Sequence, residues 1–179
     1  MNPLSRLSVK LLALPALLWS LAACSPPYNW REVRPEGTGL NLLLPCKPEK
    51  IQKTVTLGGP PVLLTLMGCD AAGATFAVAA ADLGDVALAS PALAQWQNLT
   101  LANMKAAMPV KSSPLKVQGE SVAAPPVLVT ARGQRADGSA VIGQAAYFAR
   151  GSQVFQVVMY ADKLLPDVSE TFFSSLRFE

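Results

Sequence analysis

Residues 153–160 read QVFQVVMY, the clearest β-strand in a chain of 179 residues. Side chains alternate between the two faces of a strand. Val154, Gln156 and Val158 therefore share one face, and the apolar residues between and after them share the other. The pattern predicts a strand in which one polar side chain lies among valines.

The segments before this strand extend the same pattern. Residues 127–135 and 140–150 are each rich in strand-forming residues, and Ala136-Asp137-Gly138-Ser139 between them is a strong hairpin signal. Gly151-Ser152 then connects the second strand to residues 153–160. We therefore expect three consecutive antiparallel strands.

Further strands are expected at residues 40–44, 51–57, 62–67, 75–81 and 115–122. The strand at 51–57 should be half-buried, because Ile51, Val55 and Leu57 alternate with polar residues. The strand at 62–67 should be buried on both faces. The turns at 58–60 and 70–73 are too short for helical crossovers, so these strands should pair antiparallel.

Two helices are expected. Ser90-Pro91 has cap and first-turn residues in their preferred order, which predicts a long helix that ends near Met108, before Pro109. Its apolar stripe should cover the sheet and comprises Leu93, Trp96, Thr100, Met104 and Ala107. Pro166 should open a short C-terminal helix. Helices that do not alternate strictly with strands indicate the α+β class, here an antiparallel β-sheet packed against one long helix and a short C-terminal helix.

The N-terminus carries a targeting pattern. Residues 1–23 contain no acidic residue, and an apolar run follows Arg6 and Lys10, which is the layout of a secretory signal peptide. The run ends in Leu21-Ala22-Ala23-Cys24, which resembles the lipobox of bacterial lipoproteins. The resemblance implies that residues 1–23 are removed and that the Cys24 thiol carries lipid.

Several acyl chains on one residue would anchor the protein to a membrane without a spanning helix. Residues 24–38 would then hold the lipidated cysteine and a short tether. The sorting pattern of such lipoproteins implies the outer membrane, facing the periplasm, because Ser25 rather than aspartate follows the cysteine. Residues 39–179 remain as a single domain.

With Cys24 lipidated, Cys46 and Cys69 form an even pair in an oxidising compartment, which favours a disulfide between them. Two buried free thiols are the alternative. No CxxC spacing is present, which disfavours a redox-active pair.

Composition argues against several functions. The chain has no histidine, which removes the commonest general base and the commonest zinc ligand. It carries 15 Lys and Arg against 12 Asp and Glu, with no basic run, so nucleic-acid binding has little electrostatic support. Asp82 and Asp85 could suggest an acid pair, but they are better interpreted as loop and cap residues at a helix start. We expect no catalytic residues, no cofactor and no metal.

Four segments, taken in order, are similar to those of the PsbP-like fold, which includes DcrB-type bacterial lipoproteins. The segments are residues 39–48, 75–79, 146–157 and 172–178. The resemblance implies a domain that binds protein partners or helps to assemble membrane complexes, with no family-wide catalytic residues. Cys46 and Cys69 stand where such domains usually have small apolar residues, which fits a disulfide.

These observations predict a non-enzymatic binding or assembly module, held to the membrane by lipid, with an envelope protein as partner. The alternative is a carrier or sensor of a small apolar ligand, with a pocket between sheet and helix lined by Trp96 and Phe155. Arg132, Arg135 and Arg150 could form a partner-facing patch, although a solvated sheet face is the favoured explanation.

Overall fold

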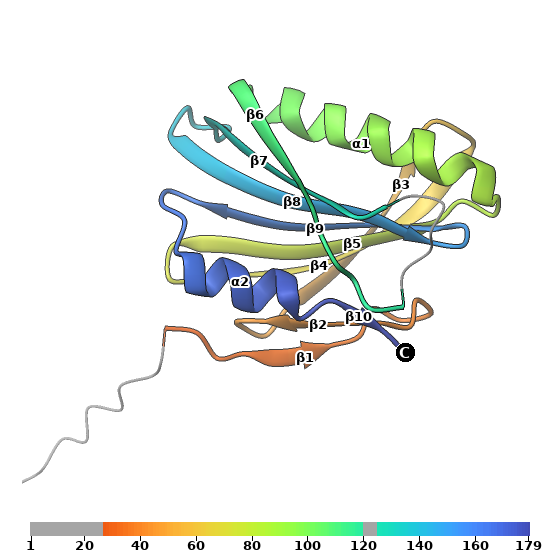
Figure 1. Cartoon of the computed structure of the whole chain (residues 1–179), viewed down its shortest axis with the longest axis horizontal. Helices are drawn as coiled ribbons and strands as arrows, with labels where there is room; N and C mark the ends of the chain where they lie inside the picture. The colour runs from red at the N-terminus through yellow and green to blue at the C-terminus, as the bar shows by residue number, and fades with distance from the viewer. Residues whose placement is uncertain (1–26, 120–124) are drawn as a thin grey trace, which may run out of the picture.

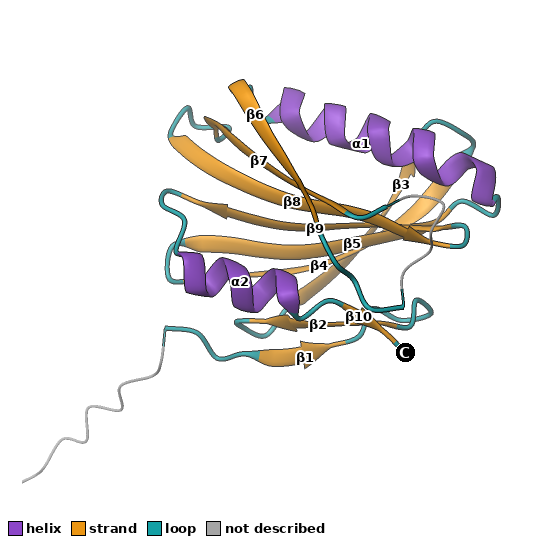
Figure 2. Cartoon of the chain, in the orientation of Figure 1, coloured by secondary structure: helices purple, strands orange, loops and turns teal. Residues whose placement is uncertain are grey.

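The computed structural model describes residues 27–119 and 125–179. The signal peptide predicted at residues 1–23, and Cys24, lie outside these residues. Within them the fold is α+β, as predicted (Figure 1; Figure 2). In chain order the elements are β1 (Arg31–Val33), β2 (Leu40–Leu44), β3 (Glu49–Thr56), β4 (Pro61–Ala71), β5 (Ala74–Asp82), the 3-10 turn η1 (Val86–Leu88), α1 (Ala89–Asn103), β6 (Ala107–Pro114), β7 (Val127–Gln134), β8 (Ala140–Arg150), β9 (Gln153–Ala161), α2 (Pro166–Ser174) and β10 (Arg177–Phe178).

The described strands form two antiparallel sheets rather than one. The large sheet has seven strands in the order β3-β4-β5-β9-β8-β7-β6, so the strand identified first in the sequence is central. The small sheet has the order β1-β2-β10. Helix α1 lies on one face of the large sheet, while α2 and the small sheet lie on the other face (Figure 1). The result is three layers, with β9 buried between the outer two.

The face opposite α1 is filled by large apolar side chains. Phe155 of β9 stacks on Phe148 of β8 with ring centroids 5.1 Å apart. Phe172 of α2 meets Phe76 of β5 edge-on at 5.2 Å. All four rings are completely buried. Strand β2 adds Leu40, Leu42 and Leu44 to this core, which confirms that these three leucines share a buried face.

The N-terminal segment docks on the same core. Tyr28 and Trp30 both contact Phe76 edge-on, at 6.4 and 6.2 Å between ring centroids. Strand β1 follows directly and pairs antiparallel with β2. Residues 28–33 therefore belong to the packed structure, in the part of the chain predicted to serve as a tether.

Two predictions about burial are wrong. Ile51 on β3 is 59% exposed, and β4 is half-buried or exposed along its length rather than buried on both faces. The cause is their place in the sheet. Strand β3 is an outer strand and β4 is its neighbour. Helix α1 packs mainly on β8 and β9 and meets β3 and β4 only near the turn that joins them, where Val55 and Val62 pack against its core.

The predicted bounds of the long helix need correction at both ends. Helix α1 begins at Ala89 and its N-cap position is Leu88, because the turn η1, capped by Asp85, leads into it. It ends at Asn103, well before Met108, and Lys105 takes a left-handed conformation (φ 47°). A residue before proline avoids the helical conformation, so Pro109 already disfavours helix at Met108.

The strand predicted at residues 115–122 is wrong for residues 115–119, because the pairing segment is β6 at Ala107–Pro114, and residues 120–122 lie outside those described. It begins where the helix was expected to continue and pairs with β7 through an irregular register between Ala107 and Lys111. The hairpin of β7 and β8 and the start of α2 at Pro166 agree with the sequence predictions.

Candidate functional site

A groove lies beside α1 on the same face of the large sheet. It consists of two adjoining hollows of about 610 Å³ and 480 Å³, which share Thr75, Gln156 and Tyr160 as lining residues. We call the two together the sheet groove. The larger hollow is further lined by residues of β3, β4, β5 and β9, and the smaller one by residues at the C-terminal half of α1 and the β7–β8 turn.

Small residues make the floor of the groove. Gly68 of β4 pairs with Ala77 of β5, and a Cβ at Gly68 would lie 2.9 Å from the Phe76 carbonyl oxygen and 3.0 Å from the Ala77 Cβ. The floor is therefore flat at this point. Around it, Leu66 and Val158 supply apolar surface.

Alanines also explain how close α1 comes to the sheet. The core beneath the helix contains seven buried alanines, which are Ala77, Ala79, Ala81, Ala89, Ala92, Ala145 and Ala149. Their short side chains let the helix backbone approach the strands, and the larger Trp96 fills the space at the helix end of the groove. The helix packs closely on the strands directly beneath it. The parts of β3, β4 and β5 beside the helix line the open groove.

One polar contact fixes the border between helix and groove. The Gln156 amide Nε2 donates hydrogen bonds to Thr100 Oγ1 at 2.7 Å and to Tyr147 Oη at 3.0 Å. Thr100 in turn donates to the Trp96 carbonyl oxygen at 2.9 Å. Buried polar groups must be paired to be tolerated, so this network both satisfies Gln156 and holds α1 to the central strand.

Tyr160 is a polar group of the groove that remains available for a bound molecule. Burial, with a smaller contribution from the nearby Tyr147, raises the pKa of Tyr160 to about 12. The hydroxyl is therefore neutral at physiological pH. It makes no hydrogen bond to another residue in the described part of the chain. A neutral O–H beside apolar surface can donate to a carbonyl or hydroxyl of a bound molecule.

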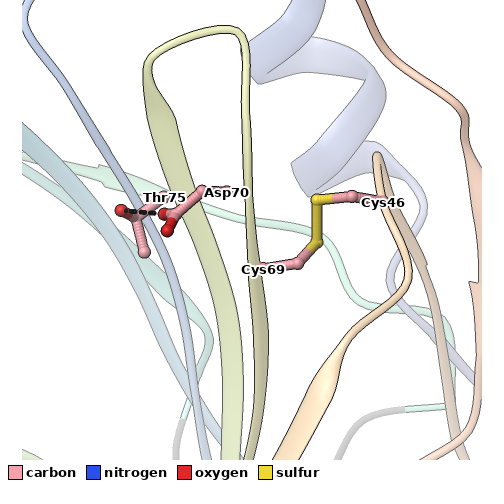
Figure 3. The surroundings of a disulfide bond; sticks show 4 residues. All are labelled: Cys46, Cys69, Asp70 and Thr75. Carbon is pink, nitrogen blue, oxygen red and sulfur yellow. Dashed lines mark hydrogen bonds between the residues drawn. A yellow bond between two sulfur atoms is a disulfide. The ribbon is translucent and has the colours of Figure 1, made fainter.

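Charged residues lie at the ends of the groove. Lys47, Glu49 and Asp70 line the larger hollow, and Arg135 lines the smaller one. Asp70 accepts a hydrogen bond from Thr75 Oγ1 at 2.6 Å across the strand pair (Figure 3). The groove thus combines an apolar floor with charges of both signs at its borders.

The predicted disulfide is confirmed and lies at the border of the groove. Cys46, just after β2, is bonded to Cys69 of β4, with Cα atoms 6.0 Å apart (Figure 3). The bond joins the chain leaving the small sheet to the large sheet. Both cysteines line the larger hollow, so the disulfide fixes one wall of the groove.

The predicted pairing of Trp96 and Phe155 as pocket lining is wrong. Trp96 lies in the core beneath α1 and lines the groove, whereas Phe155 lies in the core on the opposite face of the sheet. Adjacent residues of a strand point to opposite faces. Gln156, next to Phe155, is the residue of β9 that reaches the groove. Its signal was visible in the sequence as a polar residue among valines.

Asp82 and Asp85 both act as hydrogen-bond acceptors for local structure. Asp82 accepts from the Gly84 N–H at 2.9 Å and from Ser152 Oγ at 2.7 Å, and these two bonds lower the pKa of Asp82. Asp85 accepts from the Ala87 N–H at 2.8 Å. The interpretation is confirmed for Asp85, which caps η1, whereas Asp82 is the last residue of β5 and accepts a hydrogen bond from the loop that follows.

The three arginines do not form one patch, because Arg150 lies apart from Arg132 on β7 and Arg135 just after it. Arg135, after β7, forms an ion pair with Asp162 at 2.6 Å. Arg150 ends β8, ten residues beyond the start of that strand at the β7–β8 hairpin, and its guanidinium lies over the Phe178 ring at 4.9 Å. At about 3.3 Å per residue the two ends of β8 are roughly 30 Å apart.

Two further observations concern residues 27–119 and 125–179. No cluster of three or more acidic or cysteine side chains there could hold a metal ion. Neither α-helix in this part has the length and apolar character needed to span a bilayer.

No known protein-family model matches the chain, and no well-characterised protein matches its sequence significantly. The arguments about function therefore rest on the sequence patterns and on the groove.

Proposed function

We propose that this chain is a lipid-anchored, non-enzymatic binding module of the bacterial envelope, with a PsbP-like domain of the DcrB type. It is attached through Cys24 to the outer membrane and binds an envelope protein in the sheet groove. The sequence Leu21-Ala22-Ala23-Cys24 supports the attachment. The disulfide between Cys46 and Cys69 fits an oxidising compartment such as the periplasm.

The observation that carries the binding role is the open, preformed groove. Thr75 at its centre is exposed, as is Ile51 at its outer side. Open apolar surface rimmed by polar residues is typical of interaction sites. The neutral Tyr160 hydroxyl and the charges at both ends would orient an apolar segment of the partner within it.

A non-enzymatic role is supported by the hydrogen bonds of three acidic residues, each of which accepts a bond from a neighbouring backbone or side-chain group. Asp82 and Asp85 hold backbone N–H groups, and Asp70 holds Thr75. General acid–base chemistry needs a titratable group poised near the operating pH. The pKa of Asp82 is lowered by its hydrogen bonds, away from neutrality.

The test is photocrosslinking in intact cells. A photoreactive amino acid at Thr75, at the centre of the groove, should give an adduct with one reproducible envelope protein. Leu63 is the matched control, because it is 56% exposed on the other face of the same sheet. The same adducts at both positions, or none at Thr75, would contradict groove binding.

A second function is favoured by the dimensions of the groove. Ligand pockets typically have volumes of roughly 300–1,000 Å³ with a few placed polar groups, and the two hollows fall within that range. A small apolar ligand with one acceptor for Tyr160 would fit this description. Native mass spectrometry of the protein extracted from envelopes would show a co-purifying small molecule in this case, and only the bare lipoprotein if the groove serves a protein segment.

A further inference from the structure

The two outer strands of the large sheet differ in their exposed edges. Strand β6 contains Pro109 and Pro114, and its pairing with β7 shifts register. Prolines and irregular pairing protect a sheet edge against further strands. Strand β3 has no proline and pairs with β4 at all eight positions without a shift. Its outer edge has no backbone partner within the described residues.

The exposed side chains of β3 carry charges of both signs. Glu49 and Ile51 line the sheet groove, and by alternation Lys53 lies on that same face. On the other face Lys50 is already paired with Glu36, with Nζ and Oε2 2.7 Å apart. The groove side of the edge therefore presents an acid, an isoleucine and a base in sequence.

We propose that β3 pairs antiparallel with β3 of a second copy of this chain, with Ile51 opposite Ile51. In this register Glu49 of each copy lies opposite Lys53 of the other, so two ion pairs flank an apolar contact. Opposite charges across a strand pair stabilise it and like charges destabilise it. The two large sheets then continue into each other, and the two grooves adjoin.

Charge complementarity selects this register among the symmetric ones. In a two-fold antiparallel pair, the residue at the centre faces its own copy. Centring on Glu49, Lys50 or Lys53 would place like charges opposite each other. Centring on Gln52 or Thr54 would bring no two charges together. The register centred on Ile51 is the one within β3 that creates opposite-charge pairs.

The geometry also suits a protein held at a surface. A two-fold axis perpendicular to the sheet keeps α1 of both copies on one side. Tyr28 and β1, on the opposite face, then lie on a common side in both copies. Two chains tethered to one leaflet could pair in this way, and confinement there raises their effective concentration. The pairing itself depends on β3 alone and not on lipidation of Cys24.

Cysteine crosslinking of the full chain in envelope fractions tests the register. Ile51→Cys should form a disulfide-linked dimer under mild oxidation, because the two cysteines face each other. Thr54→Cys is the matched control on the same strand. Residue 54 would lie opposite residue 48 of the other copy, so the two control cysteines are six positions, about 20 Å, apart. The unmodified chain gives the background from other cysteines.

Charge reversal tests the ion pairs. Lys53→Glu in the Ile51→Cys chain should lower the dimer yield roughly tenfold, because both pairs change from attraction to repulsion. Adding Glu49→Lys restores the opposite charges and should restore the yield. Thermal unfolding of each variant shows that the domain is folded. Equal crosslinking at residues 51 and 54, or a reversal without effect or without rescue, would overturn the proposal. Palmitate labelling of the same samples tests the lipid anchor independently of dimer formation.

Discussion

Gly133 of β7 lies directly against Met104 at the end of α1. A Cβ on this glycine would lie 2.1 Å from the Met104 carbonyl oxygen, and that oxygen accepts a hydrogen bond from the Gln134 N–H at 2.7 Å. The absence of a side chain at residue 133 is therefore what lets the helix end bond to the sheet. The same contact sets one end of the groove.

Gly133→Ala should destabilise the protein by about 3 kcal/mol, because the new methyl group meets backbone that cannot move aside. Gly143→Ala is the matched comparison. The nearest atoms to its Cβ would be the Met104 Cε and the Tyr160 ring, each at 3.0 Å. Both are side chains that can shift, and the cost should be about 1 kcal/mol. Urea unfolding measures both. Equal effects would show that the backbone contact at Gly133 is not the constraint.

The bond between Gln156 and Thr100 should be measurable as a coupling energy. Gln156→Leu and Thr100→Val each remove one partner and should each destabilise the protein by about 1–2 kcal/mol. The double variant should lose about 1 kcal/mol less stability than the sum of the two single losses, because each single variant already removes the same hydrogen bond. Additive losses of stability in urea unfolding would show that the two residues do not stabilise the fold through this bond.

The same Gln156 variant should weaken crosslinking at Thr75 if the groove depends on the position of α1.

The strands that the sequence predicts well are those with local signals. Strand β9 and its neighbour β8 alternate regularly and are joined by Gly151-Ser152, so their pairing follows from adjacent residues. The disulfide was predicted from the number of cysteines and the compartment. Each of these needs no knowledge of residues far away in the chain.

The features that the sequence does not predict depend on distant contacts. Alternation at Ile51 indicates a buried face, but only the strand order shows that β3 is an outer strand, where Ile51 stays exposed. The residue after α1, Met104, is bonded to β7 beside Gly133, some 30 residues later in the chain. The groove requires Thr100 to meet Gln156, 56 residues later. Periodicity records which residues favour burial, and it does not record which element covers them.

The disulfide should contribute substantially to stability. Cys46 and Cys69 are separated by 23 residues, and closing a loop of that length stabilises the folded state by about 3 kcal/mol in the chain-entropy model. Cys46→Ala with Cys69→Ala should lower the urea midpoint accordingly. Reducing agent should lower the midpoint of the natural chain and leave that of the double variant unchanged. If reducing agent left the urea midpoint of the natural chain unchanged, the disulfide would not be formed in solution.

Ionisation of Tyr160 should limit stability at high pH. Because its folded-state pKa, about 12, lies above the ordinary value of 10.0, its contribution is complete below pH 10. It is lost as the pH rises from 10 towards 12. Tyr160→Phe should flatten the fall in unfolding free energy over this window and remove one late-titrating tyrosinate from the absorbance titration. An unchanged titration curve would mean that Tyr160 is not shielded from water.

The proposed lipidation depends on the thiol of one residue, so the decisive substitution is Cys24→Ser. In cells grown with labelled palmitate, this variant should lose the label and leave the membrane fraction, because without acyl chains neither described helix can hold the protein in a bilayer. Ser25→Asp is the matched control. It keeps the thiol and should keep the label, but it should move the protein from the outer to the inner membrane. A Cys24→Ser protein that still carries label and still sediments with membranes would contradict the lipid anchor, whatever the groove binds.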